Sequence, residues 1–217
     1  SFPARRSSDL SPPAASAYPS GLMRKVKKLY PMFTNAQVSA FLDGAGSTPM
    51  QRANRVKVLG QRLKTLRGVL DAWCSDEVQM RKLPGVLNDI RVSRRQVART
   101  LENCWRRITP VGWPQHQPFT SLTLTRNPVG QLPTLTEEDV AHVRSLSIMD
   151  MQAGDELAYF LKPFKGLVSL ELDRNQLTRL PEVLSHMPDL QHLRLDANQI
   201  ALTEHTLRKL AEMRTLR

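Results

Sequence analysis

The chain has 217 residues, enough for one or two domains with a sizeable core, and its hydrophobic content of 41% is ordinary for a globular protein. No run of 18 apolar residues occurs, which excludes a membrane-spanning helix, and no apolar signal core is visible near the start. The net charge of +11 is unevenly divided, because residues 1–117 hold 20 Lys/Arg and 7 Asp/Glu, whereas residues 118–217 hold 11 and 13. This charge break follows a proline-rich stretch and predicts a domain boundary near residue 118.

The first predicted elements belong to the basic half. Residues 1–20 are rich in Ser, Pro and Ala without periodicity, which indicates a disordered linker. Residues 21–30 are expected to form a short basic helix. Thr34 and Gln37 have the spacing of a capping box, which predicts a helix that runs through Leu42 and ends at the glycines beyond it.

Two longer helices are expected next. Pro49 suits the first turn of a helix, and apolar residues then recur at steps of three and four along one face. This face comprises Ala53, Val56, Leu59, Leu63, Leu66, Leu70 and Trp73. Ser93 and Gln96 are predicted to cap a last helix, whose apolar side comprises Val97, Leu101, Cys104, Trp105 and Ile108. Residues 21–117 are therefore predicted to be a helical domain, a hairpin of two long helices preceded by a helical pair.

A repeated pattern fills the remaining half. Leu167-x-x-Leu170-x-Leu172-x-x-Asn175-x-Leu177 is followed by a second copy 23 residues later. Two earlier segments fit the same pattern, one from Phe119 to Val129 with Asn127 and one from Val143 with Met151 in the Asn place. The central leucines are Leu122, Leu146, Leu170 and Leu193. Their period of 24, 24 and 23 residues is typical of leucine-rich repeats.

Each repeat of this kind is a short strand, a tight turn and a returning segment, and neighbouring repeats must stack to bury their apolar side. The predicted fold class is therefore α+β, a helical unit followed by a leucine-rich-repeat solenoid with short parallel strands over residues 118–217. The turn Asn is suited to binding unpaired backbone groups of adjoining coils. Residues 155–160 and the segment after Leu180 are expected to be return segments, the latter with Val183, Leu184 and Met187 turned inward.

Side chains at alternate strand positions point outward, because the strand period is two. In leucine-rich repeats these positions line the concave side, where partners usually bind. The candidate partner-binding residues are Thr123, Ser147, Ser169, Glu171, Asp173, His192, Arg194 and Asp196. The alternative interpretation is that they are simply solvated polar residues.

Met213 and Leu216 lie 23 residues after Leu190 and Leu193, which predicts the start of a fifth repeat in register. Because a solenoid normally needs a polar capping unit, we expect these repeats to continue in a longer parent protein.

Candidates for chemistry are few. Cys74-Ser75-Asp76 spells Cys-x-Asp, but Cys74 lies at the C-terminal end of a predicted helix, where the dipole disfavours a thiolate. Cys104 lies on an apolar helix face and is expected to be a core residue. His186, His192 and His205 have no partner pattern. We therefore expect no catalytic residue, no metal site, no cofactor and a reduced compartment.

The segments "LYPMFTNAQVSAFL", the Arg-rich helix ending in "LDAWC" and "RRQVARTLENCWRRIT" resemble the region before the repeats in large bacterial effectors of the novel E3 ligase (NEL) class. The resemblance covers residues 22–217. It implies that a ligase domain would follow the repeats in the parent, that a Cys in that domain would accept ubiquitin from an E2 enzyme, and that the repeats would select the substrate. It also implies secretion into the host cytoplasm. The ligase motif does not follow the repeats in this sequence, so the activity is not carried over to it.

The sequence thus predicts a substrate-recognition fragment that binds a host or bacterial protein on its concave face and contacts other domains of the parent. We expect no small-molecule substrate. The alternative is that the basic helical domain binds nucleic acid or an anionic membrane, with steep salt dependence. Its basic residues are spread around the helices without an aromatic stacking set, which favours a solvated surface.

Overall fold

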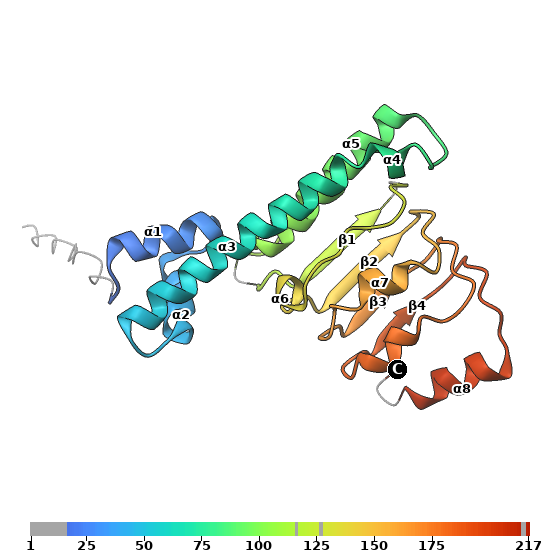
Figure 1. Ribbon diagram of the computed structural model, residues 1–217. Helices are drawn as coiled ribbons and strands as arrows, with labels where there is room; N and C mark the ends of the chain where they lie inside the picture. The colour runs from blue at the N-terminus through green and yellow to red at the C-terminus, as the bar shows by residue number, and fades with distance from the viewer. Residues whose placement is uncertain (1–16, 116, 126–127, 214–215) are drawn as a thin grey trace, which may run out of the picture. The chain divides into compact units, whose positions relative to one another are not determined.

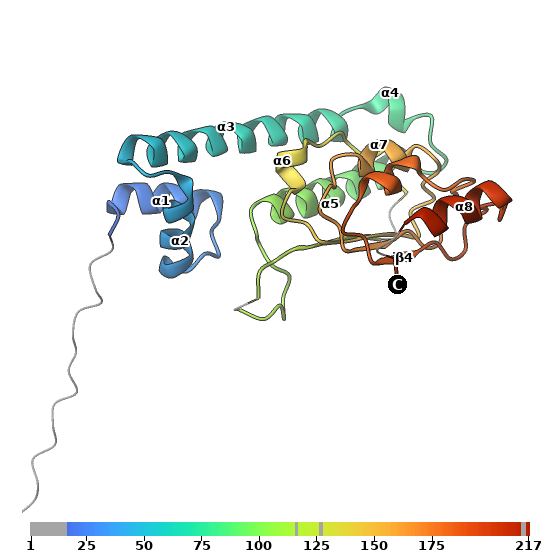
Figure 2. The same ribbon diagram turned by 90° about the horizontal axis from the view of Figure 1, so that it is seen from below.

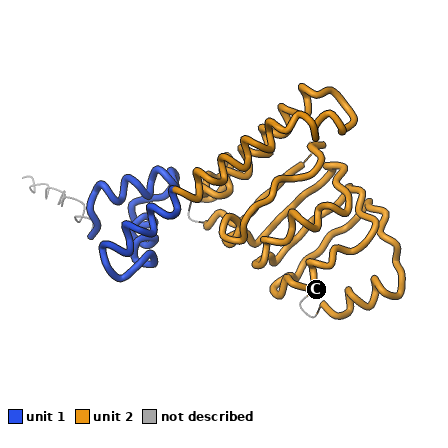
Figure 3. Tube along the Cα trace, in the orientation of Figure 1, with its two compact units in different colours: residues 1–60 blue, residues 61–217 orange. Residues whose placement is uncertain are grey.

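The computed structural model describes residues 17–115, 117–125, 128–213 and 216–217. The chain divides into two compact units, residues 1–60 and residues 61–217 (Figure 3). No helix in the described ranges is both long and apolar enough to cross a membrane. The disordered linker expected at residues 1–20 falls mostly outside the described residues, and Ser20 already belongs to a helix.

The first unit is built on two short helices and the beginning of a third. Helix α1 (Ser20–Leu29) packs against α2 (Asn35–Ala45). The Tyr30 ring stacks on Phe33, with 4.7 Å between ring centroids. The buried apolar side chains of the two helices are Met23, Val26, Leu29, Val38 and Leu42. The capping box is confirmed: the Thr34 hydroxyl accepts from the Gln37 backbone N–H at 3.2 Å, and the Gln37 amide oxygen accepts from the Thr34 backbone N–H at 2.8 Å.

Helix α3 (Pro49–Cys74) begins at the predicted proline and continues from the first unit into the second. Most of its predicted apolar face is buried, namely Val56, Leu59, Leu63, Leu66 and Leu70. The two ends of that face differ from the prediction, because Ala53 is exposed and Trp73 is only half-buried. A short helix, α4 (Glu77–Met80), follows, with the Asp76 side chain at its N-cap.

Helix α5 (Leu87–Trp105) corrects the predicted helix start, because Ser93 lies inside the helix and does not cap it. The helix begins earlier because its buried face extends backwards through Arg94 and Ile90, which continue the spacing of three and four residues. At the other end, Cys104 and Trp105 are buried as expected.

Helices α3 and α5 form the predicted antiparallel hairpin within the second unit. The backbone carbonyl of Trp73, near the end of α3, accepts a hydrogen bond of 2.6 Å from the Arg94 guanidinium, in the first half of α5. Arg67, two turns earlier in α3, forms a 2.8 Å ion pair with Glu102, near the end of α5.

Four parallel strands follow in sequence order, β1 (Ser121–Thr125), β2 (Ser145–Met149), β3 (Ser169–Glu171) and β4 (His192–Arg194) (Figure 1). The four central leucines are aligned across the sheet, from Leu122 through Leu146 and Leu170 to Leu193, as the repeat spacing predicts. Helix α5 packs against β1 at the edge of the sheet. Both the helices and the strands of the α+β prediction are therefore present.

Return segments connect the strands on one side of the sheet (Figure 2). They contain α6 (Glu137–Val140), α7 (Leu157–Leu161), the 3-10 helix η1 (Glu182–His186) and, after β4, α8 (Glu204–Glu212). The inward side chains predicted after Leu180 are confirmed, because Val183, Leu184 and Met187 are buried. Leu146, Ile148, Leu170 and Leu172 are fully buried behind the strands.

The register at the end of the chain differs from the prediction by three residues. The backbone N–H groups of Arg144, Val168 and Gln191 each donate to the carbonyl of the residue just before the preceding strand. Arg217 makes the next bond of this series, to the Gln191 carbonyl at 2.8 Å. Leu216, and not Met213, therefore takes the place of Leu190. The chain between these positions includes α8, which is longer than the earlier return segments α7 and η1 and accommodates the extra residues.

The compact units meet between residues 60 and 61, and the domain boundary expected near residue 118 on charge stays a prediction. Helix α5 and the second half of α3 belong to the same unit as the strands, because α5 packs directly on β1. The change of charge therefore falls inside a packed unit.

Candidate functional site

The side of the strands opposite the return segments carries the candidate residues, and we call it the strand face. It is defined by the alternate positions of the four strands and the residues just after them. Thr123, His192, Arg194 and Asp196 are exposed, whereas Ser147, Ser169 and Glu171 are half-buried. Asp173 is different, with only 8% of the residue exposed. The structure thus brings all eight predicted residues to neighbouring strands, but it does not leave all of them free to reach a partner.

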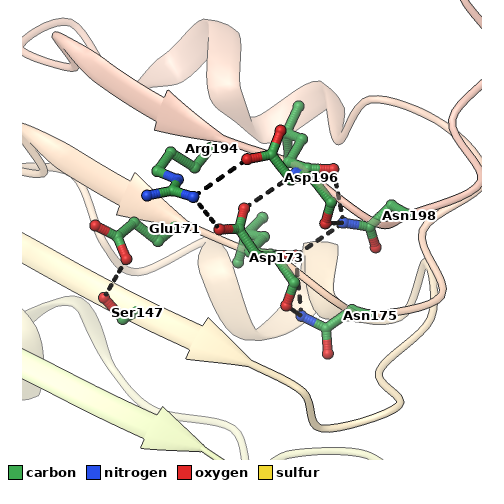
Figure 4. A network of polar contacts seen from close by, with 9 residues as sticks. Ser147, Glu171, Asp173, Asn175, Arg194, Asp196 and Asn198 are labelled. Carbon is green, nitrogen blue, oxygen red and sulfur yellow. Dashed lines mark hydrogen bonds and ion pairs between the residues drawn. The ribbon is translucent and has the colours of Figure 1, made fainter.

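The centre of the strand face is a charged network between the third and fourth repeats (Figure 4). Arg194 lies 3.1 Å from the Asp173 carboxylate and 3.2 Å from the Asp196 carboxylate. The second oxygen of Asp173 accepts from the Asp196 backbone N–H at 3.0 Å. The two carboxylates raise the pKa of Arg194, with Asp173 contributing most. The network is therefore a fixed polar patch with both signs.

The patch extends toward the second repeat. The Ser147 hydroxyl donates to Glu171 at 3.4 Å across β2 and β3. Glu171 and Arg194 are direct neighbours in the strand register. Together with Asp173 and Asp196, Glu171 gives the patch three carboxylates against one guanidinium, so the patch has a negative excess.

Beside this patch, two turn asparagines hold the repeats together, Asn175 in a buried position and Asn198 in a half-buried one. Asn175 accepts from the backbone N–H groups of Met151 and Ala153, both at 3.2 Å, and donates to the Ile148 carbonyl at 2.7 Å. Asn198 repeats the arrangement one coil later, where it accepts from Leu177 at 3.0 Å. These contacts confirm the role predicted for the turn Asn; the first such residue, Asn127, lies outside the described residues.

The turns of the second, third and fourth repeats also use a left-handed backbone residue at the same repeat position. Asp150, Arg174 and Ala197 have φ values of 57°, 57° and 55°. Residues other than Gly rarely adopt this backbone conformation, so the surrounding hydrogen bonds must maintain it. In two of these turns the bonds come from the asparagines Asn175 and Asn198.

The cysteines have the surroundings of structural residues. Cys74 ends α3, and burial is the largest cause of its raised pKa. Cys104 is buried, and burial raises the pKa of its thiol to about 12. Neither thiol has the depressed pKa that a nucleophile needs near neutral pH.

Sequence reasoning missed His142, which packs against the end of α5. Its Nε2 donates to the Cys104 carbonyl at 2.9 Å and lies 3.7 Å from the Cys104 sulfur. Its Nδ1 is buried and forms no hydrogen bond within the described part of the chain. Burial, helped by Arg107 and Arg144, lowers the pKa of His142 to about 4. No sequence signal marks it, because a single His between repeats has no recognisable partner pattern.

Sequence reasoning also missed Arg94, which is 2% exposed. Its guanidinium donates to the carbonyls of Val129, at 3.0 Å, and Trp73, at 2.6 Å, and lies 4.6 Å from the Trp73 ring centroid. The Trp73 indole in turn donates to the Gln131 carbonyl at 2.7 Å. Arg94 thereby ties the helical hairpin to the chain that follows the first strand. Its position between Ile90 and Val97 on the apolar face of the helix was the sequence signal from which its burial could have been predicted.

Several arginines of the helical half are engaged with carboxylates of the same unit. Arg62 pairs with Glu138, Arg67 with Glu102, and Arg91 with Glu77 at 2.8 Å. The exposed cations of α1 include Arg24, Lys25 and Lys27. The positive charge of residues 21–117 is thus partly engaged in ion pairs and partly exposed.

Comparison with known proteins identifies the repeats. Residues 158–200 match the family model described as leucine rich repeat. No curated protein and no solved structure matches the chain. The matched segment runs from α7 through β4 and contains Asn175, Asn198 and the charged patch. Leucine-rich repeats generally bind proteins, so this part of the chain has the features of a protein-binding region.

Proposed function

We propose that the chain is a protein-interaction module, that its repeats form a short solenoid, and that the partner binds the strand face as the concave side of this solenoid. The observation that supports this most directly is the patch of Glu171, Asp173, Arg194 and Asp196, which the neighbouring strands hold in one place. Because its charged groups are already positioned by the fold, a partner loses little entropy in ordering them.

The charges of the patch favour a partner with basic groups. Glu171 and Asp196 carry carboxylates that a Lys or Arg side chain can reach, whereas Asp173 is occupied by Arg194 and by the Asp196 backbone. Such complementary charges set specificity and the association rate more than the total affinity.

Site-specific photocrosslinking tests this proposal. A benzoylphenylalanine at Thr123 or His192 on the strand face should crosslink to the partner in a cell lysate, and the same group at Lys64 on α3 should not. The captured protein is then purified and its affinity is measured. Equal crosslinking from Lys64 and the strand face would contradict a specific site.

We further propose that the module is the substrate-recognition region of a secreted bacterial effector that acts in the host cytoplasm, with an E3 ligase domain elsewhere in the parent. This finer proposal rests on the resemblance of the helical segments to NEL-class proteins. The raised pKa of Cys74 and its place at the end of α3 support a non-catalytic role within this chain. Incubation with ubiquitin, E1 and E2 should therefore give no thioester; a reducible adduct that disappears in Cys74→Ala would contradict this.

The alternative function, binding of nucleic acid or anionic membrane by the basic helical half, has one supporting observation, the exposed cations Arg24, Lys25 and Lys27 on α1. The engagement of Arg62, Arg67 and Arg91 in ion pairs reduces the cationic surface available elsewhere. We expect only weak, salt-sensitive and sequence-independent binding to oligonucleotides or anionic vesicles. Sub-micromolar binding with preference for one nucleotide sequence would favour this alternative.

A further inference from the structure

A groove of about 650 Å³ opens on the other side of the second unit, where the return segments α7, η1 and α8 meet. We call it the return-side groove. Its lining includes the carboxylates of Asp155 and Glu182, the cations Lys162, Lys165 and Arg179, and the Tyr159 ring. None of these residues belongs to the strand face, so the groove requires its own explanation.

The two carboxylates of the groove are already engaged by the protein. Asp155 accepts from the Thr178 backbone N–H at 3.0 Å and from the Thr178 hydroxyl, which fixes it to the next repeat. Glu182 lies 3.6 Å from the Lys209 ammonium. Neither carboxylate therefore neutralises the groove as a whole.

Three further cations come from different places in the sequence. Lys162 follows α7, Lys165 lies three residues later, and Arg179 precedes η1 in the next repeat; all three are exposed. Within the described residues, none of the three has a carboxylate within ion-pair distance. The ammonium of Lys162 instead lies 5.4 Å from the Tyr159 ring centroid. The groove thus presents three cations outside any ion pair; one of them, Lys162, lies beside an aromatic ring, and another, Arg179, is near enough to Asp155 to help lower the pKa of that carboxyl.

The floor of the groove is apolar. Leu180 and Val183 are 6% and 8% exposed, and Pro181 lies between them in a buried position. An apolar floor with cations on the rim suits a peptide that places aliphatic groups below and anionic groups above. A nucleic-acid strand fits less well, because single strands are typically held by a series of large aromatic rings, and the rings that line the groove are one phenol, Tyr159, and the imidazoles of His186 and His205.

We propose that the return-side groove is a second protein-binding site, which takes a short acidic peptide segment whose carboxylate or phosphate groups contact Lys162, Lys165 and Arg179. The two faces of the repeat region then select partners of opposite charge. Two different protein surfaces are held at once, the basic one on the strand face and the acidic one on the return side.

Fluorescence anisotropy with labelled peptides tests the proposal. The probes are a Glu/Asp-rich peptide, the same peptide with phosphoserines in place of the acidic residues, and a Gln/Ser peptide of equal length. At physiological ionic strength we expect either or both of the first two to bind at least about tenfold more tightly than the neutral peptide. The comparison of the first two distinguishes carboxylate from phosphate recognition.

The double variant Lys162→Glu, Arg179→Glu should weaken that binding at least about tenfold, because it reverses two of the three contacts. The matched control is Lys64→Glu, Arg95→Glu, which changes the net charge equally at exposed positions of α3 and α5. It should bind like the parent, and Glu171→Lys on the strand face should also leave this binding unchanged. Thermal melting verifies that every variant is folded.

Three outcomes would overturn the proposal. The first is that the acidic peptides bind no better than the neutral one. The second is that the two double variants lose peptide binding equally. The third is that an oligonucleotide binds more tightly than any peptide and that its binding is lost in the variant Lys162→Glu, Arg179→Glu. The last outcome would assign the groove to nucleic acid. None of these results affects the strand-face proposal, which is tested by different residues.

Discussion

Arg194 and Asp173 form an ion pair of 3.1 Å between adjacent repeats, in which Arg194 is exposed and Asp173 is almost completely buried. The pair is therefore unequal, because the Arg194 side chain is exposed on the strand face whereas Asp173 supports the fold. Asp173 also accepts the Asp196 backbone N–H, which would otherwise have no acceptor at that place.

This inequality predicts different effects at the two positions. Asp173→Ala should lower the free energy of unfolding by about 1–3 kcal/mol, because it removes the acceptor of the Asp196 backbone N–H and one of the two carboxylates beside Arg194. Asp173→Asn keeps an acceptor and should cost less. Arg194→Ala should change the melting temperature little, since the pair is largely exposed on the Arg194 side. Urea denaturation of the three variants checks the order; a larger loss for Arg194→Ala than for Asp173→Ala would contradict it.

The central leucines should also differ in their contribution to stability. Leu170 is fully buried, and Leu170→Ala should cost about 2–5 kcal/mol by emptying a core position. Leu193 is only half-buried in the last strand, so Leu193→Ala should cost less than about 2 kcal/mol. Equal costs in chemical denaturation would show that the last strand is covered as completely as the third.

Arg94 should be a stability determinant of the junction between helices and strands. Arg94→Met removes the bonds to the Trp73 and Val129 carbonyls and should cost about 2–4 kcal/mol, the range for disrupting a buried charged network. Its neighbour Arg95 is exposed, and Arg95→Met should change the unfolding free energy by no more than about 0.5 kcal/mol. Similar costs for both variants would remove Arg94 from this role.

His142 should make stability fall as the pH is lowered. Its pKa is about 4 in the folded chain, against an ordinary value of 6.5. Above pH 6.5 the ring is neutral in both states; between 6.5 and 4 the unfolded chain binds the proton and the folded chain does not. The resulting loss is up to about 3 kcal/mol and is complete below the folded pKa.

The variant His142→Gln isolates this effect, because an amide retains a donor for the Cys104 carbonyl but does not titrate in this range. Denaturant unfolding of the parent and of His142→Gln is compared near neutral pH and at about pH 4.5. The parent should lose more stability than the variant over this interval. Parallel losses would assign the acid sensitivity to other groups.

The strands, their register and the turn asparagines could be predicted because the spacing of Leu170, Leu172 and Asn175 follows from strand period and turn geometry alone. The start of α5 could not, because Arg94 stands on the apolar face and hides its continuation toward Ile90. The burial of Asp173 depends on the Asp196 backbone, which only the stacking of two repeats brings near.

The register at Leu216 could not be predicted from the repeat spacing, because it depends on the length of α8, and the return segments of the earlier repeats are shorter. The return-side groove was missed for a related reason. Its cations belong to different repeats, and no local pattern connects Lys162 with Arg179.

The central claim is that a protein partner binds the strand face, and one comparison of affinities tests it most directly. The purified partner obtained by crosslinking is titrated with the parent chain, with Glu171→Lys and with Glu137→Lys, which makes the same charge change at an exposed position of α6 on the return side. Glu171→Lys should weaken binding at least about tenfold, and Glu137→Lys should bind like the parent. Unchanged binding by Glu171→Lys, or an equal loss in Glu137→Lys, would contradict the claim.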